Sequence, residues 1–171
     1  MNTKKIVMIG FLISVGIILQ LLESLLPIFY IVPGFKIGFG NVASLLAFQL
    51  YDRKSMFIVG LLRVFLASLL QGTFLSIPFW LSFSGCLCAS IAMILADKSK
   101  LFSLYGISIL GASFHHVGQV IMITFLYQQY YMQMYLPLLL SLSIVSGLAM
   151  ASMVTWILER IQVNKENFYG R

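Results

Sequence analysis

Apolar residues along this chain come in long continuous runs, broken at intervals by short polar segments. Crossing the hydrocarbon core of a bilayer takes about 20 apolar residues, with roughly 17 as the lower limit. We therefore expect six helices, the second of marginal length, at residues 6–26, 38–51, 55–71, 78–96, 101–127 and 135–158. Because the connections are short, consecutive helices should be antiparallel neighbours. The pattern predicts an all-α, polytopic six-helix membrane bundle that forms a single domain over residues 1–171.

One segment interrupts this pattern. Residues 31–44 read IVPGFKIGFGNVAS, where a Pro-Gly pair, Lys36, two further glycines and Asn41 break the apolar sequence. Irregular backbone at membrane depth is tolerated only where protein or a water-filled cavity satisfies its N–H and C=O groups. The segment is therefore a candidate wall of a binding site, formed by an outer loop around which the other helices are organised.

The composition excludes most soluble folds. Hydrophobic residues make up 60% of the chain, charged residues only 9%, and the mean hydropathy is +0.98. Soluble domains are about a quarter charged. The first apolar run is too long for the apolar core of a signal peptide, so we expect it to stay as a helix. Cys86 and Cys88 project in different directions from one helix, which favours packing over a disulfide or a metal site.

The positive charges orient the chain. The net charge is +6, and nine of the eleven basic residues fall at the ends of the chain and in alternate connections: Lys4, Lys5, Arg53, Lys54, Lys98, Lys100, Arg160, Lys165 and Arg171. Lysine and arginine gather on the cytoplasmic side of membrane proteins. The distribution predicts a multi-pass protein of the cell membrane with both termini cytoplasmic. It explains the charge by the lipid bilayer, without a nucleic-acid partner.

The other two basic residues, Lys36 and Arg63, do not belong to this cytoplasmic set. Lys36 lies in the outer loop, and Arg63 lies near the middle of the third helix. An unpaired charge at that depth costs roughly a few to more than ten kcal/mol, so it must face a partner or a cavity. Arg63 either binds an anionic ligand or forms a structural ion pair with Glu23, which could instead pair with Lys36. Lys36 itself either contacts ligand or anchors at the headgroups. One small or polar face of the third helix contains Gly60, Arg63, Ala67 and Gln71.

A second small and polar stripe lies on the fifth helix, at Ser108, Gly111, Ala112, His115, Gly118 and Gln119. Successive helical residues turn by about 100°, so His115 and His116 cannot face the same way. One should face the cavity and the other a helix interface. Ligand binding and interhelical hydrogen bonding both remain open for them. Asn41 likewise either contacts ligand or caps the second helix.

Together these residues predict a substrate-binding site with surplus positive charge, open to the outside and suited to an anionic small molecule. Its candidates are Lys36, Asn41, Arg63, Gln71, His115, His116 and Gln119. Catalysis has little support. The two aspartates, Asp52 and Asp97, both fall in cytoplasmic connections, and no P-loop, nucleophile elbow or HExxH motif occurs. We predict a protein that is not an enzyme, without catalytic residues, metal or cofactor.

Four segments carry a family resemblance: PGFKIGFGN, Arg63 in LLRVFLASLLQG, Ser84 and Gly85 in LSFSG, and ASFHHVGQ. Over roughly residues 6–158 the sequence resembles a bacterial membrane family called Gx transporter, or heptaprenyl diphosphate synthase component I. That family is similar to the substrate-binding S components of energy-coupling factor (ECF) transporters. The resemblance implies a six-helix protein that captures a vitamin or precursor from outside. Its partners would be a transmembrane coupling subunit and two ATPases.

In such S components small residues on the first helix dock the coupling subunit, which points here to Gly10 and Ser14, where an Ala-xxx-Ala motif would be expected. The ligand stays open, with an isoprenoid, quinone or flavin-related precursor among the possibilities. The alternative function is a non-catalytic membrane subunit associated with prenyl diphosphate or quinone synthesis, or with flavin-based extracellular electron transfer. The aspartate-rich DDxxD motif of prenyl diphosphate synthases does not occur in this chain.

Overall fold

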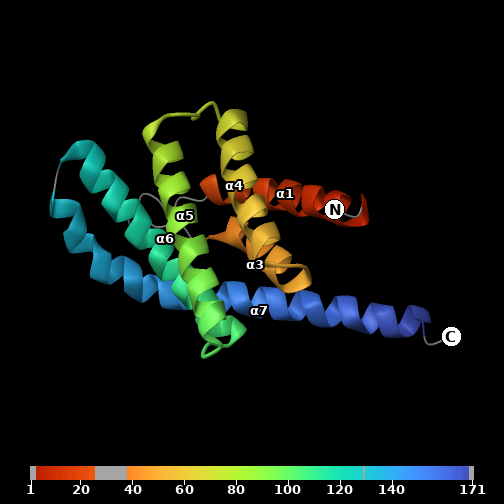
Figure 1. Ribbon diagram of the computed structural model, residues 1–171. Helices are drawn as coiled ribbons and strands as arrows, with labels where there is room; N and C mark the ends of the chain where they lie inside the picture. Colours follow the sequence, from red (N-terminus) through yellow and green to blue (C-terminus); the bar gives the residue numbers. More distant parts are fainter. Residues whose placement is uncertain (1–2, 26–37, 129, 170–171) are drawn as a thin grey trace.

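The computed structural model describes the backbone of residues 3–25, 38–128 and 130–169 (Figure 1). All regular structure in these residues is helical, which confirms the all-α prediction. Each of the six expected helices has a counterpart within a few residues of its expected start. The α-helices, with one short 3₁₀ helix η1 (Tyr130–Tyr135), are α1 (Thr3–Ser24), α3 (Phe39–Leu50), α4 (Arg53–Leu70), α5 (Ile77–Ser99), α6 (Leu104–Tyr127) and α7 (Leu136–Tyr169).

Four of these helical stretches are long and apolar enough to cross a membrane, namely α1, α5, α6 and the stretch Gln133–Ile161. The helix α3 has only 12 residues, so it is about 18 Å long and shorter than the hydrocarbon core. The helix α4 has 18 residues but carries three cations, Arg53, Lys54 and Arg63. Six membrane spans with both termini cytoplasmic therefore remain a prediction, whereas four candidate spans are present in the described residues.

The marginal second helix of the sequence pattern, α3, lies at the centre of the molecule. Six of its consecutive residues, 42–47, are buried. A helix that is apolar on all sides is stable only when protein or lipid covers it. The helices α1, α4 and α7 all pack against α3. The short helix therefore contributes to the core of the bundle, and its N-terminal end lies beside the residues described below.

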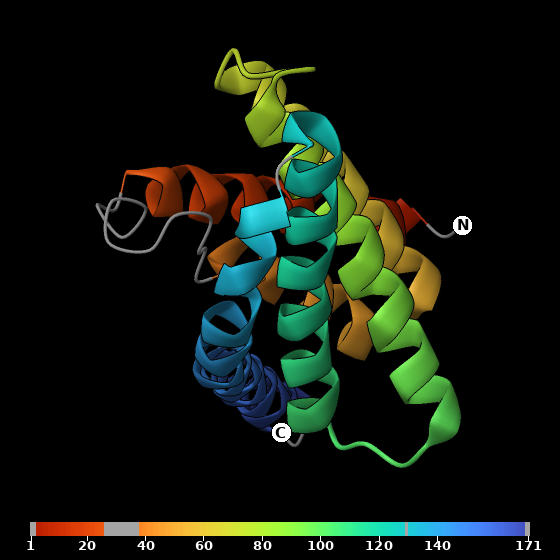
Figure 2. The ribbon, with the colours of Figure 1, turned by 90° about the vertical axis from the view of Figure 1, so that its left-hand side faces the viewer.

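The helix α1 runs across α4 instead of alongside it, as the two perpendicular views show (Figures 1 and 2). A crossing brings two helices close together over a short stretch, where a small residue is needed. Gly16 occupies this place: a Cβ atom there would lie 3.0 Å from Cβ of Ala43 in α3 and 2.7 Å from Cδ of Arg63 in α4. Short connections predict that consecutive helices pack side by side as antiparallel neighbours. The helices α5 and α6 do pack closely on each other, whereas α1 crosses α4.

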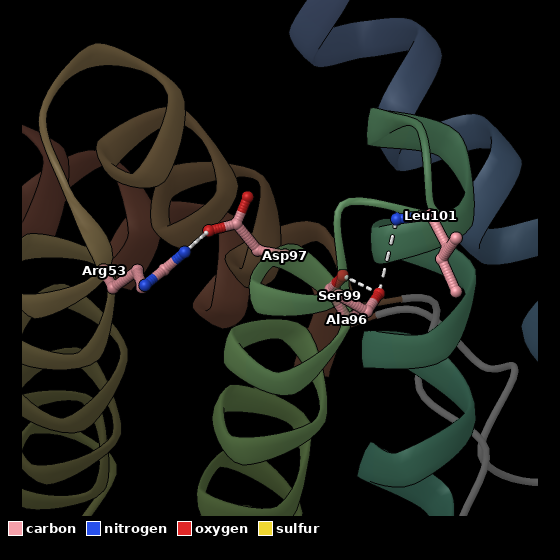
Figure 3. A network of polar contacts seen from close by, with 5 residues as sticks. All are labelled: Arg53, Ala96, Asp97, Ser99 and Leu101. Carbon is pink, nitrogen blue, oxygen red and sulfur yellow. Dashed lines mark hydrogen bonds and ion pairs between the residues drawn. The ribbon is translucent and has the colours of Figure 1, made fainter.

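Two ion pairs join ends of helices that are distant in the sequence. Nζ of Lys5 donates to Asp52 at 2.6 Å, and Nε of Arg53 donates to Asp97 at 2.6 Å (Figure 3). Asp52 also caps α4 by accepting from the backbone N–H of Ser55 at 2.7 Å. The hydrogen bond from Lys5, together with that from Ser55, lowers the pKa of Asp52 below its usual range. We call this region the basic end, defined by Lys4, Lys5, Arg53, Lys54, Lys98 and Lys100.

The close approach of α6 and α7 gives a first prediction. A Cβ atom on Gly147 would lie 2.6 Å from Cα of Ile109, which is backbone and cannot turn aside. Gly147→Ala should therefore push α7 away from α6 and destabilise the protein by roughly 1–3 kcal/mol. The melting temperature of the detergent-solubilised protein measures this loss. In the matched variant Gly10→Ala, no atom lies within 4 Å of the new Cβ, so the melting temperature should not fall. Equal melting temperatures for both variants would contradict the described packing of α6 on α7.

Candidate functional site

The centre of the candidate site is the buried side chain of Arg63, which is only 5% exposed. Its Nη1 donates to Oε1 of Gln20 at 2.7 Å, and its Nη2 donates to Oδ1 of Asn41 at 3.0 Å. The arginine comes from α4, the glutamine from α1 and the asparagine from α3. One guanidinium therefore joins three helices, and the acceptors of these two hydrogen bonds are uncharged amides.

Two glycines provide the space through which this arginine passes. A Cβ atom on Gly40 would lie 2.1 Å from Nη1 of Arg63, and one on Gly16 would lie 2.7 Å from its Cδ. Heavy atoms cannot approach so closely, so either side chain would displace the guanidinium. Gly16 belongs to α1 and Gly40 to α3. The fixed path of Arg63 thus depends on missing side chains on both neighbouring helices.

The second charged group of the site is Glu23, near the end of α1 and 6% exposed. Its Oε1 accepts from the backbone N–H of Gly38 at 2.6 Å, where α3 begins. Gly38 has a φ of 88°, a left-handed conformation that glycine adopts without strain, and no side chain caps the helix there. The first N–H groups of a helix have no partner within it and attract negative charge. The Glu23 carboxylate provides that charge at the start of α3.

These groups surround one internal cavity of about 20 Å³, lined by Gln20, Glu23, Gly38, Asn41, Arg63, Val64, Ser82 and His115. That volume holds about one water molecule. Sites for organic ligands usually measure several hundred Å³. Any ligand larger than water therefore requires the cavity to widen. The charges of Arg63 and Glu23 balance formally, so the predicted positive surplus depends on Lys36, which lies outside the described residues.

The two histidines point to different surroundings. His115 lines the cavity and packs on α5, where a Cβ atom on Gly85 would lie 2.9 Å from its Cε1. His116 is 1% exposed, and its Nδ1 lies 3.1 Å from Oε1 of Gln119, one turn later on α6. The rings are 6.0 Å apart and nearly perpendicular. His115 is thus beside the cavity, while His116 and Gln119 form a separate buried pair.

Of the sequence candidates, the structure brings Asn41, Arg63 and His115 together around one cavity. It does not place Gln71 there. Gln71 is exposed at the end of α4, where its Nε2 lies 3.4 Å from Oγ of Ser24. The capping role considered for Asn41 is wrong, because α3 has no side-chain cap and the Asn41 oxygen accepts from Arg63. The pairing considered for Glu23 and Lys36 lies outside the described residues.

The sequence interpretation missed Gln20 and Ser82. Ser82 had no distinguishing signal in the serine-rich start of α5. Gln20 did have one, because it stands three residues before Glu23 in an otherwise apolar helix, and residues at that spacing share a helical face. Two polar side chains on one face of a membrane helix indicate a polar neighbour on another helix.

The small residues Gly10 and Ser14 do not line the cavity and lie on the exposed face of α1. No atom lies within 4 Å of a Cβ built on Gly10. The hydroxyl of Ser14 donates back to the carbonyl of Gly10 at 3.0 Å. This part of α1 therefore has an open, small-residue surface within the described chain. The described residues contain no group of three or more His, Cys, Asp or Glu that could hold a metal ion.

A sequence model of the family described as "Heptaprenyl diphosphate synthase component I" matches residues 12–157, which include all the residues that line the cavity. No curated protein and no solved structure matches the chain.

The steric relation between Gly40 and Arg63 gives a second prediction. Gly40→Ala should destabilise the protein by roughly 1–3 kcal/mol, because the new methyl group displaces the guanidinium. In an Arg63→Ala background the same substitution should cost clearly less, since the clashing group is gone. Thermal unfolding of the two single variants and the double variant measures this coupling. Gly10→Ala provides the control pair, which should add independently to Arg63→Ala. A Gly40→Ala cost that is the same in both backgrounds would contradict the described position of Arg63.

Proposed function

The chain belongs to the heptaprenyl diphosphate synthase component I family. We propose a transport role for this membrane protein, whose described residues include four helices long and apolar enough to cross a membrane. It acts as the substrate-binding component of an ECF-type uptake transporter in the cell membrane. Its ligand is an anionic or amphipathic small molecule, such as an isoprenoid, quinone or flavin-related precursor. The observation that carries this proposal is the burial of the Arg63 guanidinium beside a polar cavity.

The hydrogen-bond partners of Arg63 support a binding role. Gln20 and Asn41 offer uncharged oxygens, and its Nε is buried without a hydrogen-bond partner among the described residues. A guanidinium forms stronger hydrogen bonds to a carboxylate or phosphate than to an amide. An anionic group can therefore replace the two amide oxygens with a gain in interaction. In this mechanism the ligand separates α1 from α4 as it enters, which supplies the space that the cavity of about 20 Å³ lacks.

The position of the short helix α3 also favours an anionic ligand. Transporters often place the N-terminus of an interrupted helix at an anionic substrate group. Here α3 begins at the cavity, and the Glu23 carboxylate accepts a hydrogen bond from the backbone N–H of Gly38. Glu23 thus stabilises the helix start in the ligand-free protein. His115, from α6, also lines the cavity and adds a polar contact to the bound molecule.

The first functional prediction concerns ligand retention. The protein purified in mild detergent should carry a co-purifying small anion, detected as an added mass by native mass spectrometry. Arg63→Ala should lose that mass, and Arg63→Lys should retain only part of it, because a lysine lacks the two-pronged geometry. Lys100→Ala is the control, since it removes one exposed positive charge far along the sequence from the site. Full retention of the mass by a folded Arg63→Ala protein would reject the proposed role of Arg63.

The second functional prediction concerns the partners. In the proposed transporter, Gly10 and Ser14 form the surface that meets a transmembrane coupling subunit, which in turn binds two ATPases. Affinity purification from the native membrane should recover these subunits. Ser14→Leu should reduce the recovery strongly, because a bulky side chain prevents close helix approach. Ser152→Leu makes the same change on an exposed position of α7 and should leave the recovery intact.

A second candidate function follows from the family description. The chain would then be a non-catalytic membrane subunit associated with prenyl diphosphate or quinone synthesis, which anchors a soluble enzyme. The same purification distinguishes the two. Recovery of a prenyl synthase without ATPases supports the anchoring role, whereas recovery of a coupling subunit and ATPases supports transport. A redox partner would indicate the role in flavin-based extracellular electron transfer.

A further inference from the structure

Away from the Arg63 cavity, a large groove lies between the ends of α4 and α5 at the basic end. Its volume is about 430 Å³, and it is lined by Arg53, Lys54, Phe57, Ile58 and Ile94. That volume falls within the range of small-molecule sites. The arginine and the lysine stand at the start of α4, and the apolar residues follow one turn deeper. The surface that lines the groove is apolar, and Arg53 and Lys54 contribute their apolar stems to it while their charged groups lie outside the lining.

The ion pair between Arg53 and Asp97 joins the two helices at the mouth of this groove (Figure 3). The Arg53 side chain remains 42% exposed. It links α4 to α5 close to Ile94, which is one turn before Asp97 on α5 and lines the same groove as Phe57 and Ile58. The two apolar sides of the groove are thus set by a polar contact at its end.

The charges at the mouth do not balance. Arg53, Lys54 and Lys98 contribute three positive charges, and Asp97 contributes one negative charge, so the surplus is two. Lys98 follows Ile94 by four residues and hence lies on the same face of α5, one turn closer to the end. Lys54 and Lys98 are exposed and have no ion-pair partner among the described residues. Asp52, the other nearby acid, is already paired with Lys5.

We propose that this groove binds an anionic phospholipid of the bilayer. Its phosphate lies between Lys54 and Lys98, and one acyl chain lies along Phe57, Ile58 and Ile94. Basic pockets between membrane helices attract anionic headgroups in this way. A soluble anion would contact the lysines but leave the apolar interior unused. A neutral lipid would fill the interior but leave the surplus charge unmatched. Only a molecule with both parts matches the whole groove.

The test uses native mass spectrometry of the delipidated protein with three probes: phosphatidylglycerol, phosphatidylcholine and glycerol 3-phosphate. Phosphatidylglycerol should remain bound at concentrations where the other two do not. The double variant Lys54→Gln/Lys98→Gln should weaken its binding by about tenfold or more, as expected for two basic residues near an anionic lipid. The matched double variant Lys4→Gln/Lys100→Gln removes the same charge from the basic end outside the groove, and it should change binding less than about twofold.

A second pair of variants tests the apolar interior without changing charge. Ile58→Trp fills the groove and should lower phosphatidylglycerol binding to a similar extent, while Val7→Trp on the exposed face of α1 should not. Any one of the following results would overturn the proposal: equal binding of phosphatidylcholine, equal weakening by both lysine pairs, or unchanged binding in a folded Ile58→Trp protein. Binding of glycerol 3-phosphate as tight as that of the lipid would also overturn it, because the acyl chain would then contribute nothing.

Discussion

The burial of one guanidinium constrains the centre of this protein more than any other interaction. A buried charge is unstable unless other groups solvate it. For Arg63 that solvation comes from Gln20 of α1 and Asn41 of α3. These two hydrogen bonds fix α1, α3 and α4 at one point. They also require glycines at positions 16 and 40, since any larger residue there would collide with the arginine. The crossing of α1 over α4 follows from the same requirement.

The fold was largely predictable, because the signal of membrane helices is strong and local. Long apolar runs placed all six helices within a few residues of their starts, and Pro78 marked the beginning of α5 within its first turn. The central position of α3 was harder to foresee. Its shortness suggested an imperfect span, whereas its unbroken burial shows that neighbouring helices enclose it. Hydrophobicity identifies a buried helix but does not distinguish lipid from protein as its surroundings.

The site was predictable in part, for a different reason. Arg63 and His115 could be found because ionisable groups are rare in such helices. Their mutual proximity and that of Asn41 depend on tertiary packing, which helical spacing alone does not give. The same spacing argument placed Gln71 on the face of Arg63, but Gln71 lies two turns further along, at the exposed end of α4. A shared face is thus a necessary condition for a shared cavity, and depth along the helix is a second one. The partners Gln20 and Glu23 show that α1 contributes more to the site than its apolar sequence suggests.

The nesting of Arg63 between two glycines has a consequence for how such a protein can diverge. Shortening the arginine alone leaves a void bounded by Gly16 and Gly40. It also leaves the amides of Gln20 and Asn41 without their hydrogen bonds to Arg63 in an apolar interior. Enlarging either glycine alone forces the guanidinium out of place. No single substitution converts this polar centre into a purely apolar one without a loss of stability. Arg63, Gly16 and Gly40, which lie on three different helices, must change together. A change at any one of these positions alone is therefore unfavourable, so the positive charge stays in the interior while the rest of the sequence diverges.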